Sequence, residues 1–172
     1  VATTLNADGS IVVFIDENGH SGWSAKVLEE AALGPMPTGM PVTFIDPKDG
    51  LLYVAYPANS GLLLYRRGPD GTWTLTNLTS ALPGASPVAD KLAWLISPPA
   101  GGAYGIPQPE ADLISLVGLN PSNEVVKYTQ RRTASGVRWE FTNLTTRDFL
   151  PTNQLPPDWV GDPVGYTTPW NG

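Results

Sequence analysis

The residues of this chain best suited to ligand chemistry are tryptophans and one arginine. Trp23, Trp73 and Trp139 recur at one position of an internal repeat, and an indole ring can stack on the C–H face of a sugar. Arg66 could hold an anionic or hydroxylated ligand, and strand alternation directs only one of Arg66 and Arg67 toward a given pocket. Trp170 lies outside the recurring position. The candidate ligand-binding residues are therefore Trp23, Trp73, Trp139, Arg66 and Trp170.

Each candidate also has a structural interpretation. Recurrence of the three tryptophans favours a packing role, since a residue repeats wherever the architecture repeats. The arginines next to Tyr65 are also typical of a solvated strand. Asn77-Leu-Thr79 and Asn143-Leu-Thr145 match the N-glycosylation pattern. Their common place in the repeat indicates structural turns first.

Residues for catalysis or metal binding are scarce. His20 is the only histidine and cysteine is absent, which excludes a thiolate zinc site and a thiol nucleophile. No nucleophile-elbow motif accompanies His20. The acidic turns beginning at Asp16, Asp46 and Gly68 could offer oxygen ligands to calcium, but ordinary turn chemistry is favoured. We expect no catalytic residue, no metal and no cofactor, and thus not an enzyme.

The composition narrows the class of protein. Of 172 residues, 18 are glycine and 18 are proline, and only 15% are charged, which disfavours helical bundles and coiled coils. A 41% hydrophobic fraction with six tryptophans excludes a disordered chain. The net charge of −6 disfavours nucleic acid and anionic membranes as partners. No apolar run is long enough for a transmembrane segment. The composition predicts a compact all-β protein.

An internal repeat of about 50 residues organises the chain. Apolar runs ending in an aromatic recur at Ile11–Phe14, Leu62–Tyr65 and Val125–Tyr128, and each is followed by a tryptophan. Phe44 and Trp94 open successive units. The second unit predicts four strands at Val42–Ile45, Leu51–Tyr56, Gly61–Arg66 and Thr72–Leu78. Turns are expected between them at Asp46–Gly50, Pro57–Gly61 and Gly68–Gly71.

Four short strands per repeat are the signature of a β-propeller blade. We expect strands two to four of blade 1 in residues 1–40, blade 2 in 41–86 and blade 3 in 87–160, with a long loop at 98–110. Residues 161–172 are expected to form a lone first strand that complements the incomplete first blade. Three blades are too few for a ring. A homodimer closed by exchange of strand 161–172 is therefore favoured, and pairing with a related propeller half and a half of a longer polypeptide stay open.

Three segments carry a family resemblance: "GDPVGYTTPWNG" at Gly161–Gly172, "GLNPSNEVVKY" at Gly118–Tyr128, and the Trp-to-Asn-Leu-Thr segments at Trp73–Thr79 and Trp139–Thr145. They resemble bacterial tandem propeller repeats, which are similar to fucose-lectin-like and tachylectin-like propellers of secreted or surface proteins. A dimer of two three-blade chains is expected to form a six-bladed ring, and the resemblance implies an extracellular, cell-surface or periplasmic location. Sugar-binding relatives repeat an arginine, an acid and an aromatic in each inter-blade pocket, whereas no such triad recurs in the third strands here.

These observations favour a non-enzymatic extracellular binding or scaffold module, with carbohydrate as the expected ligand. The alternative is a purely structural subunit of a larger surface or membrane-associated assembly.

Overall fold

The chain folds into three antiparallel β-sheets in sequence order. The structure, a computed structural model, describes residues 1–16, 22–28, 34–46, 49–89, 91–96, 112–133 and 136–145. The N-terminal sheet contains β1 (Ala2–Leu5), β2 (Ile11–Ile15) and β3 (Ser24–Val27). The central sheet contains β4 (Val42–Ile45), β5 (Leu52–Ala58), β6 (Gly61–Arg67) and β7 (Trp73–Asn77). The C-terminal sheet contains β8 (Leu92–Ile96), β9 (Asp112–Leu119), β10 (Val125–Thr133) and β11 (Gly136–Asn143).

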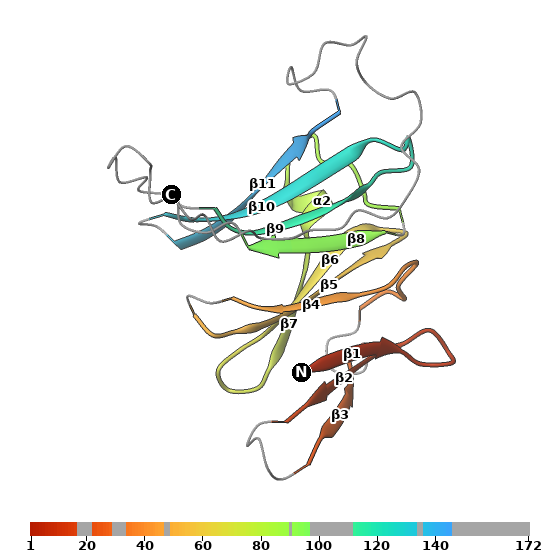
Figure 1. The fold of residues 1–172 in the computed structure, drawn as a ribbon, viewed down its shortest axis with the longest axis vertical. Coiled ribbons are helices and arrows are strands. Elements are labelled where there is room, and N and C mark those ends of the chain that lie inside the picture. Colours follow the sequence, from red (N-terminus) through yellow and green to blue (C-terminus); the bar gives the residue numbers. More distant parts are fainter. Residues whose placement is uncertain are drawn as a thin grey trace, which may run out of the picture.

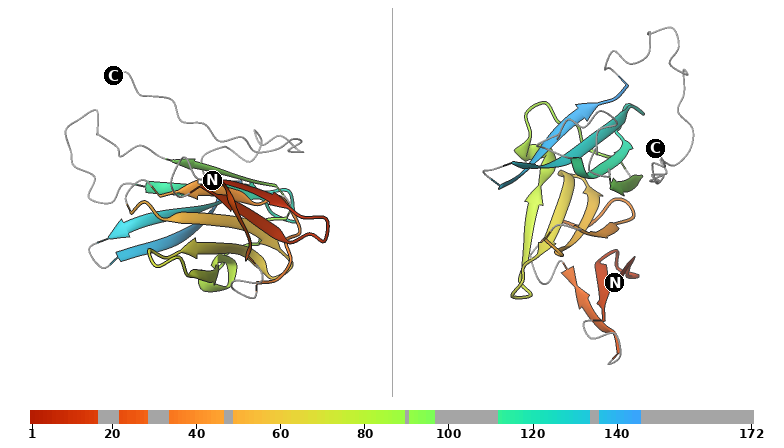
Figure 2. Two further views of the ribbon diagram at one scale, coloured as in Figure 1. Left: turned by 90° about the horizontal axis from the view of Figure 1, so that it is seen from below. Right: turned by 60° about the vertical axis from the view of Figure 1, so that its left-hand side comes forward.

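Each sheet is a meander in which every strand pairs with the next one along the chain. The expected all-β class is confirmed. Within the described residues, the sheets form an open stack rather than a closed ring, with the central sheet between the other two (Figures 1 and 2). The expected loop at 98–110, the expected strand at 161–172, His20 and Trp170 lie outside the described residues.

Two hydrophobic cores hold the stack together, one on each face of the central sheet. Alternate residues of a strand point to opposite faces, and β5 uses both faces for burial, because all seven of its residues are buried. One face packs on the N-terminal sheet through a cluster that includes Ile11, Val13, Tyr56 and Trp73. The other face packs on the C-terminal sheet through a cluster that includes Phe44, Tyr53, Leu64, Leu116 and Tyr128.

Five boundaries of the expected strands differ from the structure. Three differ by one residue only, because β5 begins at Leu52, β6 ends at Arg67 and β7 begins at Trp73. The other two, at Pro57 and Leu78, have a structural reason. Pro57 and Ala58 belong to β5, not to the following turn. The Pro57 carbonyl accepts a hydrogen bond from the Thr38 amide (2.8 Å). The nitrogen and carbonyl of one strand residue point to the same side, so the missing N–H faces away from β6 and costs no ladder bond. The last strand, β7, ends at Asn77, and Leu78 is the first residue of the short helix α2 (Leu78–Ala81).

The two Asn-Leu-Thr segments make the same hydrogen bond to a neighbouring strand. Thr79 Oγ1 accepts a hydrogen bond from the Leu62 amide (2.9 Å), and Thr145 Oγ1 accepts one from the Val125 amide (2.8 Å). Each threonine thus provides a hydrogen-bond acceptor for a backbone amide at or near the start of the third strand in its own sheet. Thr79 Oγ1 also lies 2.9 Å from the Tyr128 hydroxyl, so this segment links the central sheet to the C-terminal sheet.

Candidate functional site between the central and C-terminal sheets

A polar cavity of about 410 Å³ opens where the central sheet meets the C-terminal sheet. Its size falls in the range of small-molecule sites. The wall combines opposite charges, hydroxyl groups and an indole ring. The lining residues are Asp49, Tyr53, Leu64, Arg66, Thr74, Thr76, Val137 and Trp139.

Strand register brings the polar residues of the central sheet together. Arg66 on β6 pairs with Tyr53 on β5 and with Thr74 on β7. Directly paired residues share one face of a sheet, so the arginine lies between a phenol and a hydroxyl. Thr76 extends this row along β7. Arg67, the next residue after Arg66, points to the opposite face by strand alternation.

The acidic side of the cavity is fixed by Asp49, in the turn before β5. Its Oδ1 accepts a hydrogen bond from the Leu51 amide (2.9 Å), and its Oδ2 lies 3.5 Å from the Tyr53 hydroxyl. Burial raises the pKa of Tyr53, the Asp49 carboxylate raises it further, and the Arg66 guanidinium offsets part of the increase. The phenol is therefore a neutral hydrogen-bond donor at neutral pH. Its ring stacks on Phe44, with centroids 5.3 Å apart.

The C-terminal sheet closes the cavity from the other side. Val137 and Trp139 of β11 line it, and both lie on the face of β11 that is directed at the central sheet. Trp139 pairs with Gln130 of β10, whose side chain is fully buried. An apolar ring thus faces a charged wall across the opening. This combination suits a ligand that has both hydroxyl groups and an apolar face.

The ligand-binding residues predicted from the sequence lie in different parts of the structure. The structure brings Arg66 and Trp139 together in the cavity. Trp73 is 8% exposed and packs in the core toward the N-terminal sheet, with its ring nearly perpendicular to that of Tyr65. Trp23 is 59% exposed on the N-terminal sheet, away from the cavity. Trp170 lies outside the described residues.

Among the lining residues that the sequence interpretation missed are Asp49, Tyr53 and Thr74. Asp49 was assigned to a turn, and the other two to ordinary strand positions. The signal that could have found them is register, because the residues that flank Arg66 across the sheet are fixed once the two hairpins are aligned. A single sequence predicts where the strands lie, but it does not predict which residue of one strand pairs with which residue of the next.

The equivalent place between the N-terminal and central sheets has different chemistry. Ile15 takes the position of Arg66, one residue after the third-strand aromatic, and Ser24 pairs with it as Thr74 pairs with Arg66. Ile15 is buried in the core with Trp73. The site is thus specific to the second seam of the stack.

Other kinds of site have little support in the described part of the chain. No three histidine, cysteine or acidic side chains gather there in a metal-binding arrangement. Asp70, in one turn considered for calcium, instead accepts hydrogen bonds from the amide and hydroxyl of Thr72. The described residues also contain no helix of the length and hydropathy required to cross a membrane.

Comparisons with protein-family models, with curated proteins and with solved structures found no match to this chain.

Proposed function

We propose that this chain is a non-enzymatic binding module of β-propeller type that holds a carbohydrate in the cavity between the central and C-terminal sheets. The observation that carries the proposal is the joint placement of Arg66, Asp49 and Trp139 around one opening. An arginine donates to sugar hydroxyls, a carboxylate accepts from them, and an indole covers the apolar ring face.

The propeller architecture is part of the proposal. Three stacked antiparallel meanders are what successive blades would present, and two of them carry a tryptophan at the same register position, Trp73 opposite Arg67 and Trp139 opposite Gln130. The sheets would be completed into a ring by a second copy or a related partner, at an extracellular or cell-surface location. The second candidate function is a structural subunit of a surface assembly, which the extensive sheet-to-sheet cores favour.

A glycan array followed by calorimetry with the best-bound sugar tests the binding function. Arg66→Ala should weaken affinity by at least about 10-fold, because a charged hydrogen bond contributes roughly 1.5–3 kcal/mol. Arg67→Ala is the matched control, since it removes the same side chain from the opposite face. Its affinity should stay within about 2-fold of the wild type.

Two results would contradict the proposal in different ways. Absence of binding across a broad array would favour the structural subunit. Binding that survives both Arg66→Ala and Trp139→Ala would place the site elsewhere on the chain.

A further inference from the structure

The Arg66 guanidinium in the cavity wall has no carboxylate partner in the described part of the chain. Its side chain is exposed, and no described acidic group lies within ion-pair distance of it. Asp49 lines the same cavity, but it contacts Tyr53 on the β5 side of Arg66. The Tyr53 phenol is neutral at neutral pH, so it does not balance the charge. The cavity thus presents an exposed cation to whatever binds there.

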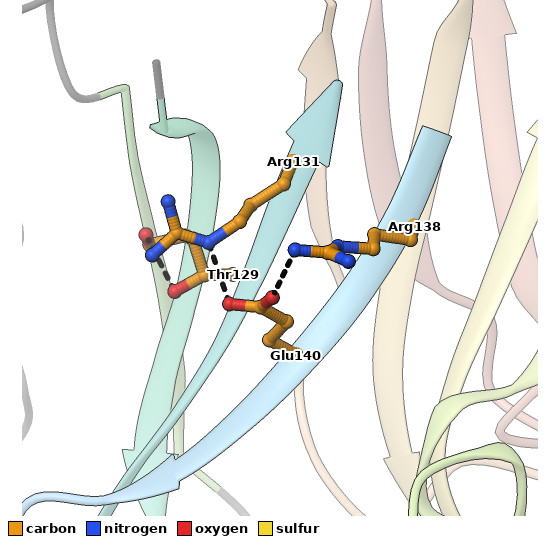
Figure 3. Close-up of polar contacts among 5 residues, drawn as sticks. Thr129, Arg131, Arg138 and Glu140 are labelled. Carbon is orange, nitrogen blue, oxygen red and sulfur yellow. Dashed lines mark hydrogen bonds and ion pairs between the residues drawn. The ribbon is translucent and has the colours of Figure 1, made fainter. Parts of the chain in front are cut away.

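Two arginines of the C-terminal sheet, by contrast, contact a carboxylate of the chain. Glu140 lies 2.5 Å from Arg131 Nε and 2.9 Å from Arg138 Nη2 (Figure 3). Glu140 belongs to β11 and pairs directly with Thr129 of β10. The acid that binds these two arginines therefore comes from the fourth strand of their own sheet.

Register identifies the residue of the central sheet that corresponds to Glu140. Tyr65 and Tyr128 hold equivalent places in the third strands of their sheets. The residue after each tyrosine pairs with Thr74 in the central sheet and with Glu140 in the C-terminal sheet. Thr74 is exposed, and its hydroxyl donates to the Arg66 carbonyl (3.4 Å). A neutral hydroxyl thus lies beside Arg66 where the next repeat has a carboxylate.

We propose that the ligand of this cavity is an acidic sugar whose carboxylate binds the Arg66 guanidinium, as Glu140 binds the arginines of the C-terminal sheet. This assignment rests on the proposed function, because it specifies the class of sugar that the same cavity holds. A guanidinium and a carboxylate form two parallel hydrogen bonds in one plane, and a hydroxyl group has no equivalent geometry. The pair therefore favours an acidic sugar over a neutral one.

The rest of the wall fits the other parts of an acidic sugar. The Thr74 and Thr76 hydroxyls belong to β7 and line the cavity beside Arg66, where they can donate to the carboxylate oxygens. Asp49, on the β5 side, accepts from sugar hydroxyls. Trp139 covers the apolar face of the sugar ring. The sugar is thereby oriented with its acid group toward β7 and its hydroxyls toward β5.

Calorimetry with matched acidic and neutral ligands tests the assignment. The acids are the methyl glycosides of glucuronate, galacturonate and N-acetylneuraminate, and each is compared with its own carboxyl methyl ester. At least one acid should bind at least about 10-fold more tightly than its ester, because the ester cannot form the charged pair.

The possible failures are distinguishable. If neutral sugars from the glycan array bind through Arg66 and no acid is preferred over its ester, the assignment is overturned and the proposed function stands. If no sugar of either kind binds, both are contradicted.

Thr74→Glu tests the pairing from the side of the protein. It places on β7 the carboxylate that Glu140 supplies on β11, so Arg66 should form an ion pair within the chain. The preference for the acid over its ester should then disappear. Thr74→Gln is the matched control, because it has the same length without the charge, and it should keep the preference even if both affinities fall. An unchanged preference in Thr74→Glu would overturn the assignment.

Substitutions of Arg66 separate its charge from its geometry. Lysine keeps the positive charge but lacks the planar fork of donors. Arg66→Lys should therefore keep part of the preference for the acid, whereas Arg66→Gln should abolish it. Melting curves of both variants establish the temperature below which they are folded, and binding is compared there. A preference that survives Arg66→Gln would assign the carboxylate to another residue and overturn the proposal.

Discussion

At the scale of single residues, Gln130 is the least satisfied buried polar side chain among the residues that the structure describes. It is fully buried on β10, and within the described part of the chain neither its amide nitrogen nor its amide oxygen has a hydrogen-bond partner. A buried polar group without a partner costs roughly 1–3 kcal/mol. Such a cost is characteristic of positions retained for a purpose other than stability, and Gln130 pairs directly with the cavity residue Trp139.

Gln130→Met should therefore stabilise the fold by about 1 kcal/mol, because it keeps the side-chain volume and removes the unpaired amide. Tyr128→Phe is the contrasting variant. The Tyr128 hydroxyl donates to the Ser86 carbonyl (2.6 Å) and lies 2.9 Å from Thr79 Oγ1, so its loss should destabilise. Chemical denaturation measures both changes, and a less stable Gln130→Met variant would show that the amide is satisfied in solution.

The candidate site could be predicted only in part, and the tryptophans show why. Trp73 and Trp139 occupy the same position in the repeat, yet one packs in the core and the other lines a cavity. The difference lies in the opposing sheet, where Ile15 faces the first seam and Arg66 the second. Which sheet opposes which is a tertiary fact that residue type and spacing do not contain.

At the scale of elements, three hairpins are built on one turn geometry. Each turn spans five residues. The amide of the first residue donates to the carbonyl of the fifth, and the amide of the fourth donates to the carbonyl of the first. The three turns are Asn6–Ser10, Gly68–Thr72 and Asn120–Glu124. The fourth residue has positive φ in each, and in the last turn it is Asn123, at φ 60°. In the first two turns, the third residue is an aspartate, Asp8 or Asp70, that accepts from the amide and hydroxyl two positions later.

These two aspartates predict an acid-sensitive component of stability. Hydrogen bonds from Ser10 and Thr72 lower the pKa of Asp8 and Asp70 from the ordinary value of 3.8. The folded state therefore releases these protons more readily than the unfolded state. The stabilisation is present above pH 3.8 and is lost as the pH falls through the folded pKa values.

The double variant Asp8→Asn, Asp70→Asn keeps the acceptor oxygens and removes the titration. Its melting temperature should fall less steeply than that of the wild type below about pH 4. The two proteins should differ least at the acid end, where both carry neutral side chains. Parallel melting curves over the acid range would show that the two turns do not contribute.

The strands themselves were largely predictable, because the repeat and the glycine-rich turns specify them locally. β4 coincides with the expected Val42–Ile45. The errors at Pro57 and Leu78 have tertiary causes. Pro57 extends β5 because the segment at Thr38 supplies its carbonyl with a donor. Leu78 turns inward because helix α2 buries it in the core between two sheets.

At the scale of the whole molecule, the stack predicts graded stability. Each sheet contacts only its neighbours along the stack, as in other repeat architectures, and the central sheet alone among the three is covered on both faces by described residues. Amide hydrogens of β5 and β6 should exchange most slowly, and those of β1 and β3 fastest. Hydrogen exchange with mass spectrometry measures this order. Uniform protection across all three sheets would indicate a single cooperative unit instead.

The cavity between the central and C-terminal sheets has a mechanical consequence. Its walls belong to two layers, with Arg66 on one and Trp139 on the other. A molecule bound there touches both layers and has to leave before they can separate. Binding would therefore stabilise the contact between the two sheets. The force or temperature needed to separate them would rise with ligand concentration.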